Sequence, residues 1–91
     1  MADYNAGLTL GNIQGQKDSR LLIPPSPLTK DNDDIYQLGY RNGYYIGYTK
    51  GLASMLKANN NNDLKNLIAI RLNDVSESML KENSKDKQKR Y

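Results

Sequence analysis

The stretch "GYRNGYYIGYTKG", residues 39–51, places a glycine at every fourth position. A tyrosine stands three residues before each of these glycines. The eight positions are Gly39, Gly43, Gly47, Gly51, Tyr36, Tyr40, Tyr44 and Tyr48. Steps of four keep the glycines on one helix face, with a drift of about 40° per step. The stretch therefore predicts a helix with a groove of glycines, bordered by a ridge of tyrosine rings.

This helix is costly to form alone. A glycine in a helix interior costs about 1 kcal/mol relative to alanine, so four glycines cost roughly 4 kcal/mol. That loss is comparable to much of the stability of a small domain. A second helix packed closely into the groove would offset it, as small-x-x-x-small pairs do in membranes. Arg41, Asn42 and Lys50 disfavour a membrane setting here, so we expect the same packing in water.

The helix is predicted over about residues 33–58. Before it, "TKDNDD" supplies Asp31 or Asn32 as a cap, and Asp33 and Asp34 place negative charge in the first turn. After it, "NNNN" at residues 59–62 favours a turn, because asparagine tolerates turn conformations.

A second helix is predicted over about residues 63–83, with Asn61 or Asn62 as its cap. Its apolar residues recur at steps of three and four. They are Leu64, Leu67, Ile68, Leu72, Val75, Met79 and Leu80. Two helices joined by a short turn predict an antiparallel hairpin covering residues 31–83.

The flanking segments are predicted to be irregular. Residues 1–30 begin with a Gly-, Asn- and Gln-rich stretch, which indicates an irregular N-terminal arm. Residues 84–91 read as a disordered basic tail, since residues 81–91 hold five basic and two acidic residues and so the whole net charge of +3. The expected fold is therefore all-α: a two-helix antiparallel hairpin with an irregular arm, assembled as a homo-oligomer.

The end of the arm is a candidate partner-binding segment. It consists of Leu21, Leu22, Ile23, Pro24, Pro25 and Pro27. Its P-x-x-P spacing could dock into an aromatic groove of another protein. The preferred interpretation is a rigid spacer, whose prolines favour extended backbone while the three apolar residues pack on the hairpin.

The composition argues against catalysis. The chain contains no cysteine and no histidine, which excludes Ser/His/Asp and Cys/His nucleophile systems and the usual zinc sites. No phosphate-binding loop motif is present. Asp31, Asp33 and Asp34 are better interpreted as helix-capping residues than as a cation site. We therefore expect no catalytic residue, metal or cofactor, and a protein that is not an enzyme.

The chain is expected to be cytoplasmic. No run of about 18 apolar residues is present, so no membrane span is expected. The N-terminal residues lack the features of a secretory signal. The absence of cysteine fits a reducing compartment.

The leading functional prediction is a non-enzymatic protein–protein interaction module, such as an adaptor, chaperone-like protein or inhibitor. A chain of 91 residues buries a modest core, which favours association with a copy of itself or with another protein. The groove and ridge together cover most of the first helix, so we expect it to contact two neighbours. Whether the glycine groove is filled by the same chain, by a second copy or by another protein stays open.

The alternative is a nucleotide- or nucleic-acid-binding protein. In this interpretation Tyr44 stacks on a base at a subunit interface, and Arg41 and Lys50 supply positive charge. It is the less favoured prediction, because stacking sites are usually interleaved with more basic residues than this stretch contains.

The glycine repeat at residues 36–52 resembles the N-terminal glycine-repeat helices of flagellar and type III export-ATPase regulators. It is also similar to the glycine-repeat proteins that act as adaptors in iron–sulfur protein maturation. In those families the intervening positions are rich in Glu, Lys and Gln, whereas here they read "YRN", "YYI" and "YTK". The resemblance implies an interaction helix that pairs closely with another helix, and it implies no particular partner or activity.

Overall fold

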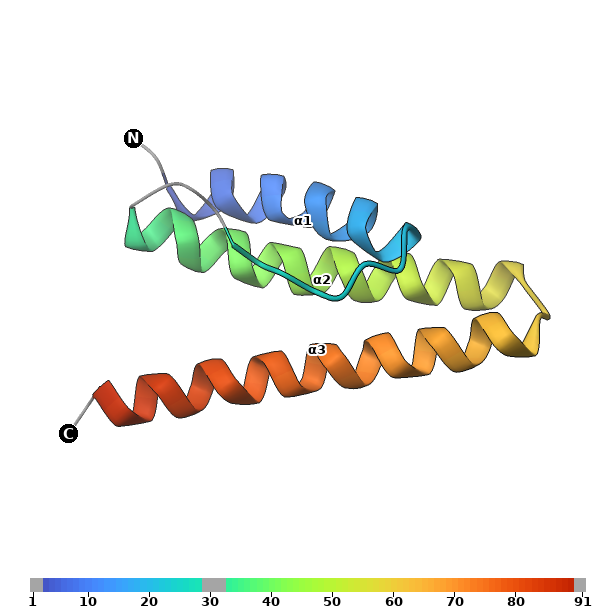
Figure 1. Ribbon diagram of the computed structural model, residues 1–91. Helices are drawn as coiled ribbons and strands as arrows, with labels where there is room; N and C mark the ends of the chain where they lie inside the picture. Colours follow the sequence, from blue (N-terminus) through green and yellow to red (C-terminus); the bar gives the residue numbers. More distant parts are fainter. Residues whose placement is uncertain (1–2, 29–32, 90–91) are drawn as a thin grey trace.

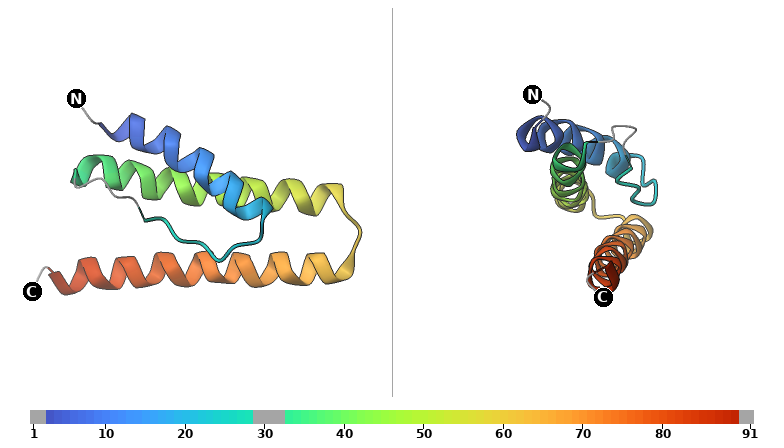
Figure 2. Two further views of the ribbon diagram at one scale, coloured as in Figure 1. Left: turned by 45° about the horizontal axis from the view of Figure 1, so that its top comes forward. Right: turned by 90° about the vertical axis from the view of Figure 1, so that its left-hand side faces the viewer.

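The computed structural model describes residues 3–28 and 33–89 and is all-α over these ranges. It contains three helices: α1 (Tyr4–Arg20), α2 (Asp34–Ala58) and α3 (Asn62–Lys89). Helices α1 and α2 lie side by side and run in the same direction (Figure 1). Helix α3 returns antiparallel to α2 on the side away from α1 (Figure 2). The predicted antiparallel pair is therefore present as α2 and α3, but a third helix precedes it.

The prediction of an irregular N-terminal arm is wrong for residues 4–20, which form α1. Asp3 caps this helix by accepting a hydrogen bond from the Ala6 amide at 2.8 Å. The residues of α1 have low intrinsic helix propensity, but tertiary packing overrides propensity where a helix is held against a neighbour. Here that neighbour is α2, against which the glycines of α1 are buried.

Helix α2 begins and ends close to the predicted bounds of 33 and 58. Its cap is Asp33, whose carboxylate accepts hydrogen bonds from the amides of Ile35 at 2.9 Å and Tyr36 at 3.1 Å. Asp33 was expected inside the first turn rather than as the cap. The predicted caps Asp31 and Asn32 lie outside the described residues.

Helix α3 is capped by Asn61, which is one of the two caps predicted for it. Its side-chain oxygen accepts from the amides of Asp63 at 2.9 Å and Leu64 at 3.2 Å. The helix then continues to Lys89, well past the predicted end at residue 83. The expected disordered tail at 84–91 thus differs from the structure up to Lys89, where Lys- and Gln-rich sequence without glycine or proline allows a helix to propagate.

Residues 21–28, called here the strap, lead back from the end of α1 alongside α2 (Figure 2). The strap opens with a turn at residues 21–22, where the φ of Leu22 is 57° and therefore left-handed. Residues 23–28 then continue without helix or strand, as the prolines predict. The Leu22 amide donates to the Ser19 carbonyl at 2.9 Å and the Ile23 amide to the Asp18 carbonyl at 3.1 Å, which is a Schellman ending usually built with glycine. Leu22 also packs against the core.

Helix α2 is the centre of the molecule. The buried core joins four of its residues to two of α3: Tyr44, Tyr45, Tyr48, Leu52, Ile68 and Val75. The predicted ridge is present as stacked rings, with centroids of Tyr40 and Tyr44 6.4 Å apart and those of Tyr44 and Tyr48 5.9 Å apart. Over the described residues, none of the three helices combines the length and the hydropathy that a membrane crossing requires.

Candidate functional site: the glycine seam and the uncharged stripe

The glycine groove of α2 is filled by α1 of the same chain. Buried small residues line both sides of this contact, which is called here the glycine seam. They are Gly7, Gly11, Gly15 and Ser19 of α1 and Gly39, Gly43, Gly47 and Gly51 of α2. The predicted interface glycines therefore meet a helix in cis, and the helix is one that was expected to be an irregular arm.

The seam brings backbone against backbone. A Cβ atom added to Gly11 would lie 2.8 Å from the carbonyl carbon of Tyr40 and 2.9 Å from the amide nitrogen of Tyr44. A Cβ atom added to Gly43 would lie 2.8 Å from the carbonyl carbon of Leu8. Real Cβ atoms essentially never approach other atoms this closely, so only glycine fits. Backbones in such proximity form Cα–H···O contacts, which contribute to close helix pairs.

A signal for α1 is present in the sequence. Tyr4 precedes Gly7 by three residues, just as Tyr36 precedes Gly39, and small residues then follow at every fourth position to Ser19. Comparing the two segments with each other would have identified a second helix of the same design. Composition alone could not identify it, because a seam made of backbone contains few apolar side chains.

Two tyrosine hydroxyls of the ridge hold the strap. Tyr44 is fully buried, and its hydroxyl donates to Asp18 Oδ2 at 2.6 Å and accepts from the Ser26 amide at 3.0 Å. The hydroxyl of Tyr48, also fully buried, donates to the Ile23 carbonyl. Tyr44 and Tyr48 therefore fix the end of α1 and the strap to the middle of α2.

Burial also changes the acidity of these tyrosines. It raises the pKa of Tyr48 to about 12, an effect that the Arg71 charge partly opposes. The pKa of Tyr44 is raised further, by burial first and then by the hydrogen bond to Asp18. Burial likewise raises the pKa of Tyr40. All three groups are neutral near pH 7, and neutral hydroxyls can donate the bonds described above.

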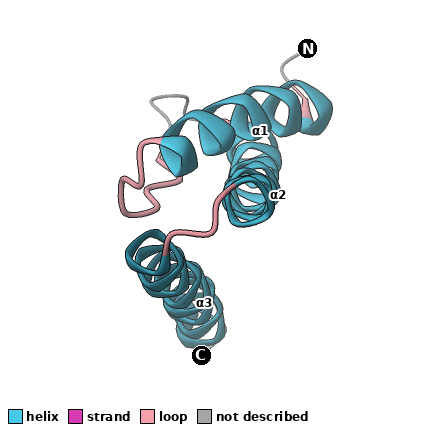
Figure 3. Cartoon of the chain, turned by 90° about the vertical axis from the view of Figure 1, so that its right-hand side faces the viewer, coloured by secondary structure: helices cyan, strands magenta, loops and turns pink. Residues whose placement is uncertain are grey.

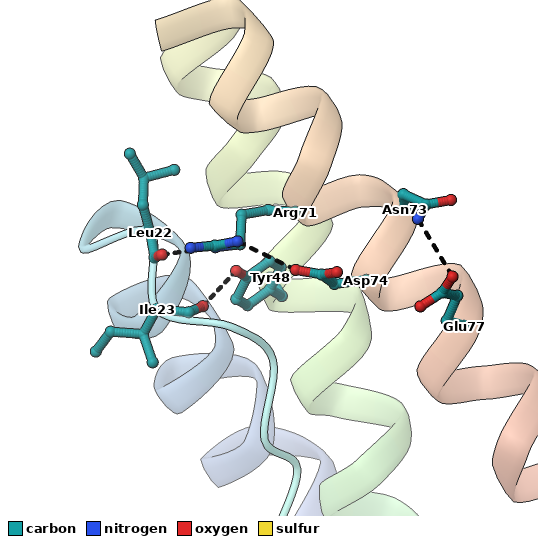
Figure 4. A network of polar contacts seen from close by, with 7 residues as sticks. All are labelled: Leu22, Ile23, Tyr48, Arg71, Asn73, Asp74 and Glu77. Carbon is teal, nitrogen blue, oxygen red and sulfur yellow. Dashed lines mark hydrogen bonds and ion pairs between the residues drawn. The ribbon is translucent and has the colours of Figure 1, made fainter.

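The Arg71 side chain joins α3 to the strap, as Figure 4 shows. The Arg71 Nε donates to the Leu22 carbonyl at 2.7 Å, and its Nη1 pairs with Asp74 Oδ2 at 3.2 Å. The strap therefore lies between α1 and α3 on one side of α2 (Figure 3). The predicted partner-binding residues Leu22 and Ile23 use their carbonyl groups inside the chain.

The residues of the alternative ligand site are not brought together. Tyr44 has no exposed surface on which a base could stack. Arg41 and Lys50 are nine positions apart on α2, which places them about 180° apart around the helix. The structure thus separates the three residues that a nucleotide site at this position would require.

No metal site is found among the described residues: no three His, Cys, Asp or Glu side chains gather there. Asp33 caps α2, as shown above, and the neighbouring Asp31 lies outside the described ranges. A shallow hollow on α1 is lined by Leu8, Thr9, Asn12 and Ile13, none of which is an ionisable residue.

A long face of α2 lies outside both the seam and the core. It contains seven residues at steps of three and four, none of them charged. They are Ile35, Leu38, Asn42, Ile46, Thr49, Ala53 and Leu56, called here the uncharged stripe. At about 100° per residue these positions lie within an arc of about 80°. All except Thr49, which is half-buried, are exposed.

The apolar side chains of the uncharged stripe are the most unusual exposed surface of α2. The exposed fractions are 60% for Ile35, 45% for Leu38, 46% for Ile46 and 43% for Leu56. Single exposed apolar residues are common, whereas these four lie on one face of one helix. The repeat of glycine and tyrosine does not include these four residues, so the sequence prediction did not identify them as a separate surface.

Comparisons with protein-family models, with curated proteins and with solved structures found no match to this chain.

Proposed function

We propose that this chain is a non-enzymatic protein-binding module that associates with a second copy of itself through the uncharged stripe. The observation that carries the proposal is the row of exposed apolar residues along the whole of α2. Spacings of three and four are those of a helix that packs along its length against another helix.

The surroundings of the uncharged stripe also support this proposal. On α3, Arg71 contacts the strap, while Leu72 and Met79 lie about 80–100° further round the helix, past the buried Ile68 and Val75. These two side chains, 41% and 46% exposed, therefore lie on the edge of α3 away from the strap. The strap covers the opposite side of α2, so the stripe and this edge form one open apolar surface.

A polar residue at the middle of the stripe adds specificity. Asn42 lies between Leu38 and Ile46, and its side-chain nitrogen donates to the Tyr4 hydroxyl at 3.0 Å. Single polar residues in an apolar helix seam favour one register of pairing, because other registers leave them unsatisfied. In a dimer, Asn42 would thus favour the register in which its side-chain oxygen also has a hydrogen-bond partner.

The proposal is tested by measuring molar mass with light scattering over a range of concentrations. The wild type should exceed the monomer mass of 10.3 kDa, and Leu38→Glu should shift the transition to at least tenfold higher concentration. Such a shift corresponds to about 1.4 kcal/mol, a modest loss for burying a charge in an apolar contact. The matched control is Ser54→Glu, an exposed position of α2 outside the stripe, which should associate as the wild type does. A monomeric wild type, or equal masses for the two variants, would contradict the proposal.

A further inference from the structure

The glycine seam has an internal two-fold symmetry. Gly7 and Gly39 differ by 32 positions, and so do Tyr4 and Tyr36. Gly7 faces the carbonyl oxygen of Tyr36, and in return Gly39 faces the carbonyl oxygen of Tyr4. The glycine of each helix therefore contacts the carbonyl oxygen of the equivalent tyrosine in the other helix.

This exchange of contacts repeats along the seam. Gly11 faces the carbonyl oxygen of Tyr40, and Gly43 faces that of Leu8. Gly15 and Gly47 repeat it with Tyr44 and Asn12. The two glycines of each pair differ by 32 positions, and so do the two residues whose carbonyl oxygens they face. An interface in which residue i contacts j while j contacts i is the signature of a two-fold dimer, formed here by two segments of one chain.

We propose that α1 occupies the place of a second α2, so that displacing α1 allows α2 to pair in parallel with α2 of another copy. This inference concerns the glycine seam and does not depend on the uncharged stripe. The occupant it names is α2 itself, because the seam contacts seen between α1 and α2 are those that two identical α2 helices would make. In the chain as it stands, α1 is an intramolecular competitor of that pairing.

The side chains favour the pairing as well as the backbone. At the end of the seam, the Ser19 Cβ would lie 3.0 Å from a Cβ added to Gly51. Two α2 helices would instead bring glycine to glycine at this point and remove the Ser19 side chain, which lies among the atoms nearest to Gly51. Beside the seam, Asn12 and Gln16 occupy the positions equivalent to Tyr44 and Tyr48. A second α2 would thus replace two amides with two large aromatic rings, which bury more apolar area.

The closed form persists because α1 is tethered. A short connection gives the attached segment an effective concentration on the order of millimolar, which a second copy must exceed. The bond from Tyr44 to Asp18 adds to the affinity of α1 for this place. Weakening α1 selectively should therefore release the pairing, whereas weakening α2 should not.

The test compares two full-length variants at equivalent positions, Gly11→Leu in α1 and Gly43→Leu in α2. Both are made with Leu38→Glu, so that association through the stripe does not contribute. Each leucine is expected to disrupt the α1–α2 contact to the same extent. Only Gly11→Leu leaves all four seam glycines of α2 unchanged. We expect a doubling of molar mass for Gly11→Leu and the monomer mass of 10.3 kDa for Gly43→Leu. Equal masses would overturn the inference.

A cross-linking reporter identifies which helices pair. The chain contains no cysteine, so Ser54→Cys introduces a single thiol on the seam side of α2, beyond the end of α1. In a parallel α2 pair the two copies of this position meet, and oxidation should link most of the Gly11→Leu protein as a dimer. The control thiol, Ala69→Cys on the exposed surface of α3, should cross-link at least tenfold more slowly. Equal cross-linking of the two thiols would indicate non-specific association and overturn the inference, even if the mass doubles.

Milder substitutions cover the case in which leucine unfolds the chain. Gly11→Ala and Gly43→Ala change the same two positions by one methyl group, and circular dichroism reports whether helices α2 and α3 remain. The same asymmetry of mass is expected for this pair. A result in which both alanine variants stay helical and monomeric would also overturn the inference. Failure of the stripe proposal would instead appear in the Leu38→Glu and Ser54→Glu comparison, which these variants leave untouched.

Discussion

The Tyr44 hydroxyl donates a 2.6 Å hydrogen bond to Asp18 Oδ2 and thereby joins the middle of α2 to the last turn of α1. The two residues come from helices that pack mainly through glycine backbone, so this bond is one of few side-chain interactions across the contact. It also lies next to the Ser26 amide, which donates to the same hydroxyl. One buried phenol thus holds α1, α2 and the strap together.

Removing this hydroxyl should destabilise the fold. Tyr44→Phe is expected to lower the free energy of unfolding by about 1.5–3 kcal/mol, the range for a hydrogen bond to a charged group. Urea denaturation followed by circular dichroism measures the change. Tyr4→Phe is the matched control, because its hydroxyl accepts a hydrogen bond from the exposed Asn42, and it should cost less than about 1 kcal/mol. Similar losses for the two variants would contradict the assigned role of Tyr44.

Stability should fall at alkaline pH. An unfolded tyrosine has a pKa near 10, whereas burial raises the pKa of Tyr48 to about 12. The folded state holds this proton more tightly, so its contribution is complete below pH 10 and is lost as the pH rises towards 12. Each such group lowers the free energy of unfolding by about 1.4 kcal/mol per pH unit in this window.

Unfolding curves measured between pH 9 and 12 test this dependence, since about pH 10 marks ionisation of the unfolded tyrosines. Above that pH, Tyr48→Phe should reduce the slope of the free energy of unfolding against pH by the contribution of one bound proton. Tyr44→Phe should have the same effect. A stability that is flat with pH across this window would show that the buried hydroxyls are not held as described.

The seam should reject a single methyl group. Gly43→Ala gains about 1 kcal/mol in helix propensity, but its Cβ would meet the Leu8 backbone well inside contact distance. Overpacking of this kind costs about 1–3 kcal/mol or more, so we expect a net loss and a lower melting temperature. Ser54→Ala on the exposed part of α2 is the control and should be neutral or slightly stabilising. A melting temperature that rises for Gly43→Ala would disprove the close approach.

The strap should be released when Arg71 is shortened. Arg71→Met keeps the apolar stem but removes the donor to the Leu22 carbonyl, a bond of 2.7 Å. We expect cleavage within residues 21–28 by thermolysin to become about tenfold faster, which corresponds to a loss of about 1.4 kcal/mol. Lys65→Met, an exposed change on the same helix, should leave the rate unchanged. An unaltered rate in Arg71→Met would mean that the strap is held by other contacts alone.

The elements that could be predicted from the sequence are those with local signals. Helix α2 has a repeat and an acidic cap, and α3 has apolar spacing and the Asn61 cap, so both were located. Helix α1 was missed because its stability comes from backbone contact with a distant segment, which gives no apolar periodicity. The role of Tyr44 was missed for a related reason: its burial depends on the path of the strap, which only the complete fold specifies.

The parallel direction of α1 and α2 has a consequence for the order in which the chain folds. Each seam contact joins residues about 30 positions apart, such as Gly7 with Tyr36, whereas α2 and α3 are joined by a short turn. Closing the longer loop costs more entropy, and contacts distant in sequence form more slowly. The glycines of α1 also prevent it from becoming helical in isolation. Helix α1 is therefore expected to fold last, on the surface of an existing α2, and to be the first element to leave it.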